Sequence, residues 1–168
     1  MKKKFHLLVL ISIIAISCNS NSIEVSDKME KEIRFALENL VIGNLKHWEP
    51  PFKEEKFLQD FTNSDDFSFT LDGIHIQTFE KWKSIVYESM EYDRKNHKHY
   101  KHIVNEIQVT VLSKRSGIVT LNYNWDYITN DNHHYITNAI LTSVCRYENN
   151  KWKMINSHCS HGEKRVIN

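Results

Sequence analysis

The sequence is poor in the residues that interrupt regular structure, with four glycines and two prolines among 168 residues. That composition excludes collagen-like and linker-rich architectures. Hydrophobic residues make up 40% of the chain and charged residues 26%, which excludes both a disordered tail and a multispan membrane protein. The length corresponds to about one domain.

A large excess of charge of either sign is also absent. Three of the 22 Lys and Arg residues are Lys2, Lys3 and Lys4, which lie in a segment that we expect to be removed. Subtracting these 3 from 22 leaves 19 basic residues against 21 acidic ones, so the mature chain has a small negative charge. A general case for nucleic-acid binding is therefore removed.

The longest apolar run, Phe5–Ile16, lies at the N-terminus and is shorter than the roughly 20 residues of a membrane-spanning helix. It follows the three lysines, as in a signal peptide, which we expect to comprise residues 1–17. The sequence Ala15-Ile16-Ser17-Cys18 then resembles the lipobox of bacterial lipoproteins, with alanine in place of the usual leucine.

This resemblance implies that Cys18 becomes the lipidated first residue and that residues 18–25 form a tether to a membrane. Two or more acyl chains anchor a protein stably, whereas one does not. The expected location is a bacterial cell envelope, at the outer membrane or the cell surface. An ordinary secretory signal that ends near a cysteine is the alternative.

Two cysteines remain, Cys145 and Cys159. A two-residue turn at Asn149-Asn150 would pair Glu148 with Lys151, which fixes the register of the hairpin around it. In that register the cysteines lie five rungs apart on opposite faces, beyond the reach of a disulfide. The sequence therefore predicts that both are unpaired.

We expect one domain over residues 26–162, followed by a short tail over residues 163–168. Apolar residues recur at helical spacing in three segments, one that begins after Asp27 and two over Lys53–Phe61 and Thr78–Arg94. A hairpin with an Asp72-Gly73 turn lies between the last two segments. The first part of the domain is therefore expected to be mostly helical.

The last third has the period of two that is typical of strands. Long strands are expected over Ile103–Leu112, Ile118–Ile128, His133–Tyr147 and Trp152–Ser160. This order of elements predicts an α+β fold, in which three N-terminal helices pack on one face of a curved antiparallel sheet. The hairpin register places Trp152, Met154, Asn156, His158 and Ser160 on the same face as Cys145.

Trp152, Met154, His158 and Ser160, at alternating positions, resemble the closing strand of SnoaL-like proteins in the nuclear transport factor 2-like superfamily. The similarity is greatest to the association domain of calmodulin-dependent kinases, although Asn156 stands where that pattern has a first histidine. The resemblance implies a cone-shaped barrel with a pocket on its concave face. It also implies a homodimer formed by the outer face of the sheet.

His158 is the main candidate for chemistry, because the resemblance places its face inside the cone. A neutral histidine there binds a ligand carboxylate or acts as an acid or base, whereas the alternative is a hydrogen-bonded core histidine. The predicted pocket lining comprises Tyr123, Trp125, Tyr127, Asn156 and His158. The three aromatic residues equally suit a filled core.

Ten histidines make a metal site worth considering. On an extended segment His97 and His99 would share a face and His102 would not, and the chain has neither a CxxC nor an HExxH motif. We therefore expect no metal and no cofactor. Asp72 lies in a turn and Asp126 points away from the aromatic face, so the sequence reveals no acid–base pair.

The sequence thus favours a lipid-anchored, non-enzymatic module that binds a small hydrophobic or carboxylate ligand, or a partner segment, in its cone. One alternative is an isomerase or dehydratase of the SnoaL type, with His158 as acid or base and Tyr123 assisting. The other is a structural dimer whose cone is filled by its own side chains.

Overall fold

The computed structural model describes residues 25–167. The predicted signal peptide and Cys18 lie outside the described residues. Within them, none of the helices combines the length and the apolar character that crossing a membrane requires.

Three helices form one layer of the domain: α2 (Asp27–His47), α3 (Glu54–Leu58) and α4 (Phe79–Asn96). The Ser26 side chain caps α2 by accepting a hydrogen bond from the backbone N–H of Met29, and Thr78 caps α4 in the same way. The apolar stripe of α2 faces the sheet and buries Ile33, Leu37, Val41 and Leu45. The three predicted helices are therefore present.

Six strands form the second layer, with the spatial order β2-β1-β6-β5-β4-β3. Their bounds are β1 (Ser68–Leu71), β2 (Ile74–Ile76), β3 (His97–Ser113), β4 (Ser116–Thr129), β5 (His134–Glu148) and β6 (Lys151–Ile167). Neighbouring strands are antiparallel except β1 and β6, which are parallel. The sheet is therefore mixed, and not wholly antiparallel as the sequence suggested, because the short hairpin joins it beside the last strand.

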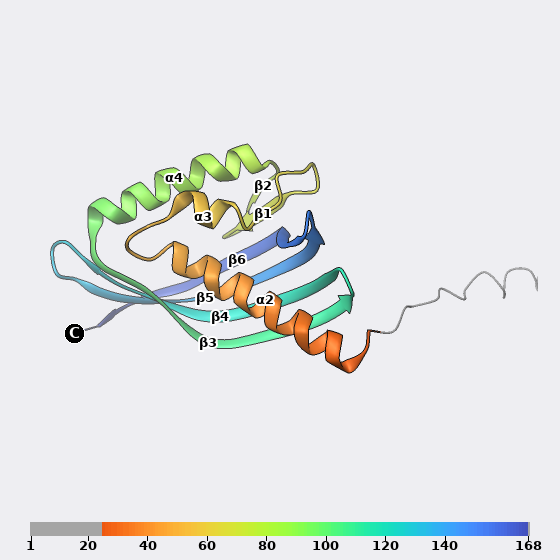
Figure 1. Ribbon diagram of the computed structural model, residues 1–168. Helices are drawn as coiled ribbons and strands as arrows, with labels where there is room; N and C mark the ends of the chain where they lie inside the picture. The colour runs from red at the N-terminus through yellow and green to blue at the C-terminus, as the bar shows by residue number, and fades with distance from the viewer. Residues whose placement is uncertain (1–24, 168) are drawn as a thin grey trace, which may run out of the picture.

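The helices lie along the concave side of the strongly bent sheet, as Figure 1 shows. Leu37 and Val41 of α2 are fully buried against the sheet, where Val119 and Leu121 of β4 are fully buried as well. This arrangement confirms the predicted α+β cone.

Strand β3 begins at His97, earlier than the sequence predicted. Irregularities between His97 and His99 and between Val104 and Glu106 break its alternation of side chains. Each such bulge shifts the apolar pattern to the other face, which hides the strand from a search for a period of two. Strand β6 likewise continues to Ile167, into the segment expected to be a tail.

The predicted register of the β5–β6 hairpin is correct near its turn and wrong beyond it. Glu148 pairs with Lys151, and Cys145 pairs with Met154, as expected. The next rung pairs Val144 with Asn156, so one extra residue has entered β6. A single added residue moves every later side chain of a strand to the opposite face.

The bulge brings Ser157 and Cys159 to the concave face, where both are buried, and turns Asn156 and His158 outward, where both are exposed. The prediction that His158 shares a face with Cys145 is therefore wrong. The two cysteines instead both belong to the concave side. Both are free thiols, which confirms that they are unpaired.

Two residues of α2 provide a matched test of this packing. We expect Leu37→Ala to lower the free energy of unfolding by roughly 2–5 kcal/mol, because it leaves a cavity in the core. Phe35→Ala, on the exposed side of the same helix, should change it by less than about 0.5 kcal/mol. Urea denaturation of both variants measures the difference, and equal losses would contradict the packing of α2 on the sheet.

Candidate functional site

A cavity of about 500 Å³ lies between the helices and the concave face of the sheet. Its wall is mainly aromatic, and includes Phe69 of β1, Trp82 of α4 and Tyr100 of β3. Trp82 stacks on Phe69 with ring centroids 4.0 Å apart, which stiffens one side of the wall. A cone with this much open space does not fit the hypothesis of a filled structural dimer.

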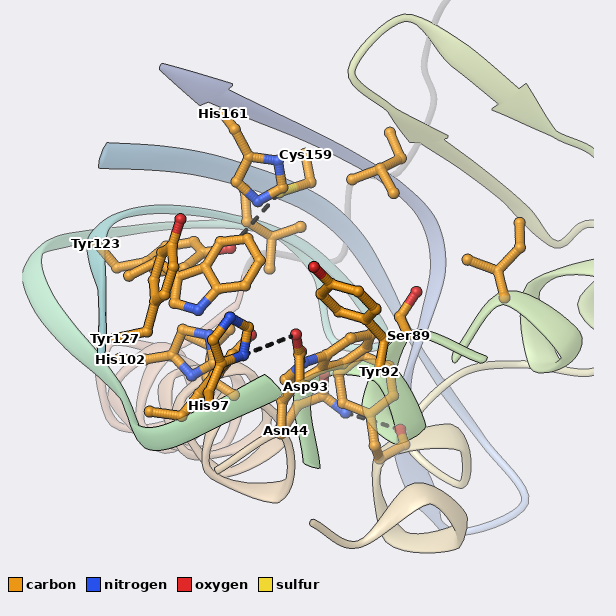
Figure 2. Close-up of a pocket in the computed structure, with 18 of the residues that line it drawn as sticks. Asn44, Ser89, Tyr92, Asp93, His97, His102, Tyr123, Tyr127, Cys159 and His161 are labelled. Carbon is orange, nitrogen blue, oxygen red and sulfur yellow. Dashed lines mark hydrogen bonds and ion pairs between the residues drawn. The ribbon is translucent and has the colours of Figure 1, made fainter. Parts of the chain in front are cut away.

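The three aromatic residues predicted on β4, Tyr123, Trp125 and Tyr127, all line the cavity. Figure 2 shows Tyr123 and Tyr127 on the same side of it. The Tyr123 hydroxyl lies 3.6 Å from the Cys159 sulfur, and both groups are buried. Burial raises the pKa of the Cys159 thiol to about 11, so this cysteine is a neutral part of the wall.

Asn156 and His158 do not belong to the cavity, so their prediction as pocket residues is wrong. Asn156 hydrogen-bonds to Ser68 of β1, and the His158 ring lies 3.3 Å from the Ser160 hydroxyl. The bulge in β6 places both side chains on the outer face. His158 therefore cannot act on a ligand held in the cone.

His161 is the histidine of β6 that lines the cavity. Its ring Nδ1 lies 2.9 Å from Oδ2 of Asp72, and its backbone N–H donates to Oδ1 of the same carboxylate at 2.8 Å. Asp72 is held in the β1–β2 turn with a φ of 49°, and its own backbone N–H donates to the Cys159 carbonyl. The turn and β6 therefore fix one another.

The contact with Asp72 determines which nitrogen of His161 is available. Partial burial alone would raise the pKa of Asp72, but the hydrogen bonds from His161 outweigh it and hold that pKa below its usual value. An ionised carboxylate only accepts hydrogen bonds, so Nδ1 of His161 must donate. In the neutral ring, Nε2 then carries the lone pair. The hydrogen bonds that His161 makes to the described residues use its backbone N–H and Nδ1, and leave Nε2 free. The pair is therefore arranged as a general base and its orienting carboxylate.

A second histidine–carboxylate pair lies in the cavity wall where α4 meets β3. Nδ1 of His97 lies 3.3 Å from Oδ1 of Asp93, without the geometry of a hydrogen bond, and the Trp48 indole donates to Oδ2 of Asp93 at 2.8 Å. Figure 2 shows this pair well apart from His161. Burial raises the pKa of Asp93 in spite of the Trp48 hydrogen bond, and burial lowers the pKa of His97. Both shifts favour the neutral forms.

His102, on β3, is a third buried histidine of the wall. Its Nδ1 lies 3.7 Å from the Glu49 carboxylate and makes no hydrogen bond to the described residues, and burial lowers its pKa to about 4. The bulge between His97 and His99 turns His97 and His102 to the concave face and leaves His99 exposed. The prediction that His97 and His99 share a face is therefore wrong.

The described residues contain no group of three or more His, Cys, Asp or Glu side chains that could hold a metal ion. Asp126 points to the outer face, as predicted, where it lies 2.7 Å from His134.

The sequence analysis missed Asp72 and His161 as a pair because they are 89 positions apart. The strong turn at Asp72-Gly73 was its only visible signal.

No protein-family model matches this chain, and no curated protein matches it. Solved structures do. A scytalone dehydratase-like protein from Novosphingobium aromaticivorans has a TM-score of 0.72 and 10% sequence identity, over 85% of this chain and 93% of that one. A hexachlorocyclohexane dehydrochlorinase from Novosphingobium barchaimii has a TM-score of 0.69 and 15% identity, over 84% and 94%.

A nuclear transport factor 2-like protein of unknown function from Shewanella oneidensis has a TM-score of 0.58 and 15% identity, over 76% of this chain and 98% of that one. The TM-scores establish the fold, whereas sequence identities this low leave the chemistry open. The chain therefore has the nuclear transport factor 2-like fold, as the motif in its last strand implied.

The buried state of His102 predicts a dependence of stability on pH. The folded protein keeps this ring neutral down to a pKa of about 4, whereas the unfolded chain takes up a proton near pH 6.5. Unfolding therefore binds a proton as the pH falls between these values, and stability is lost in that window. The loss due to His102 should be roughly 2 kcal/mol at pH 5 relative to pH 7.

Urea denaturation at the two pH values tests this expectation. His102→Gln should reduce the difference between pH 7 and pH 5 by that amount, while His99→Gln, at an exposed position of the same strand, should leave it unchanged. An unaltered difference in His102→Gln would show that His102 is protonated in the folded protein.

Proposed function

We propose that the domain binds a small aromatic or alicyclic molecule in the cavity and catalyses proton transfer on it, as an isomerase or an eliminating lyase. His161 is the general base, and Asp72 orients it and stabilises its protonated form. The observation that carries the proposal is the 2.9 Å contact between His161 Nδ1 and Asp72 Oδ2 beside an aromatic cavity.

The surroundings of the pair suit this chemistry. A neutral imidazole whose Nδ1 is fixed by a carboxylate presents Nε2 as the proton acceptor. The aromatic walls suit a flat or ring-shaped substrate, which they would contact by its apolar faces. The Tyr123 hydroxyl is a neutral group in the same wall, because burial raises its pKa well above the usual value, and it is suited to hydrogen-bonding an oxygen that gains charge.

The names of two similar structures agree with this class of reaction. One is named as a dehydrochlorinase and the other as a dehydratase, and both names describe the elimination of a small molecule. Their low identity to this chain means that the resemblance supports the reaction class and does not identify the substrate.

A binding module without turnover is the second candidate, and it is favoured by the engagement of both Asp93 oxygens by Trp48 and His97, which keeps that carboxyl from acting on a ligand. Asp93 and His97 partner each other, which leaves the Asp72–His161 pair to perform any proton transfer alone. The two candidates share the cavity and its apolar ligand, and they differ in whether His161 moves a proton.

Exchange of the acidic α-protons of 2-tetralone in D₂O, followed by proton NMR, separates the two candidates. We expect the purified protein to accelerate the exchange above the buffer rate, and His161→Ala to lower the catalysed rate by roughly 10²-fold. Asp72→Asn should lower it by roughly tenfold or more, because the amide no longer fixes the same tautomer.

His158→Ala is the control for this assay, because it removes a histidine from the outer face of the same strand. It should retain the wild-type exchange rate. Exchange that is catalysed equally by His161→Ala would contradict the proposed base, and binding of 2-tetralone without any exchange would favour the module without turnover.

We further propose that the protein is held at a bacterial membrane by lipid on Cys18. The proposal is supported by the basic start, the apolar run and the small residue before Cys18. The described domain begins its first helix at Asp27, which leaves a short polar segment between the cysteine and the fold. A cavity at the envelope would meet small molecules that enter the cell.

Metabolic labelling with palmitate in a bacterial host tests the anchor. We expect label on the wild-type protein and none on Cys18→Ser, because acyl chains are attached to that thiol. Cys145→Ser, at a buried cysteine, should be labelled like the wild type. Unlabelled wild-type protein would show that the N-terminus is an ordinary secretory signal.

A further inference from the structure

A lysine lies on the concave face of the sheet beside the proposed base. Lys164 and His161 are three positions apart on β6, a spacing that puts side chains on opposite faces of a regular strand. A second irregularity alters this, because His161 pairs with Ala139 and Lys164 pairs with Thr137. Three steps on β6 therefore match two steps on β5, and both side chains line the cavity.

The Lys164 ammonium is held by aromatic rings. Its Nζ lies 3.8 Å from the centroid of the Tyr135 ring and 5.6 Å from that of Tyr127. The faces of these rings attract a cation but leave most of its hydrogen-bonding capacity unused. None of the ion pairs among residues 25–167 uses Lys164.

The other charged groups of the cavity leave this ammonium without a counter-ion. Asp93 is already engaged by Trp48 and His97. Glu88 accepts a hydrogen bond from the Ser84 hydroxyl at 3.0 Å and is exposed to solvent. The cavity wall therefore combines a hydrophobic interior with one unpaired positive charge.

We propose that Lys164 is an anion-binding residue that selects ring-containing substrates with a carboxylate group. The inference deepens the proposed function and rests on it. The carboxylate pairs with the ammonium beside Tyr127 and Tyr135, while the ring of the substrate lies along Trp125 toward His161. Lys164 thereby orients the substrate for the base.

The spacing of the two residues suits such a ligand. Their partners on β5 are two residues apart, so His161 and Lys164 are separated along the sheet by about 7 Å. That is the scale of one aromatic ring with a carboxylate attached. The Trp125 ring lies 5.3 Å from His161, and Trp125 pairs with Thr137, the cross-strand neighbour of Lys164. An apolar surface therefore connects the base to the cation.

Binding of 2-naphthoate and of its neutral isostere 2-naphthamide, measured by NMR titration, tests this proposal. We expect the wild-type protein to bind the carboxylate roughly fivefold more tightly, with a preference that falls as salt is raised. Lys164→Gln should abolish the preference by weakening carboxylate binding and leave the affinity for the amide unchanged. Lys164→Arg should retain the preference.

Arg165→Gln is the matched control, since it removes a positive charge from the adjacent position, which is exposed like Lys164 but lies on the opposite face of the strand. It should keep the wild-type preference. Equal binding of the two compounds by the wild type, absence of binding by either, or a preference that persists in Lys164→Gln would overturn the assignment. Equal binding would leave the proposed function standing. A carboxylate preference that is lost in Lys164→Gln, together with exchange of 2-tetralone that does not need His161, would overturn the proposed function and leave the Lys164 assignment standing.

Discussion

The pairing of β6 with β5 controls which side chains reach the cavity. A strand presents alternate residues to opposite faces, so a shift of one residue in its pairing moves every later side chain to the other face. Strand β6 contains two such shifts, one after Met154 and one after His161. The first brings Cys159 and His161 inward, and the second adds Lys164 to the same face. Without them, the concave face of β6 would carry a different set of groups.

The cost of polar burial explains how the cavity is organised. A charged group removed from water is expensive unless it is paired. Asp72 and Asp93 each have a histidine as partner, and Asp93 also accepts from Trp48. His102 avoids the cost by remaining neutral. The walls thus contain acid–base groups in a mainly aromatic environment, which is where a change of protonation has the largest effect on a bound molecule.

Sequence reasoning was accurate where local patterns decide the outcome. The helical stripe of α2 and the alternation of Tyr123, Trp125 and Tyr127 depend on neighbours a few positions away, and both are present. It failed for His158, because a bulge depends on how two strands pair and leaves no regular pattern in either. It also overlooked Asp72 and His161, since a turn residue and a late strand residue meet only when β1 lies beside β6.

The sequence by itself determined the α+β layout and the aromatic face of β4, because period, composition and short turns are local properties. Only the tertiary structure decided that His161 and not His158 faces the cavity, that Asp72 fixes its tautomer, and that Lys164 lies beside it. The physical reason is that these three facts depend on hydrogen-bond register between strands distant in the chain. No residue pattern within a single strand specifies that register.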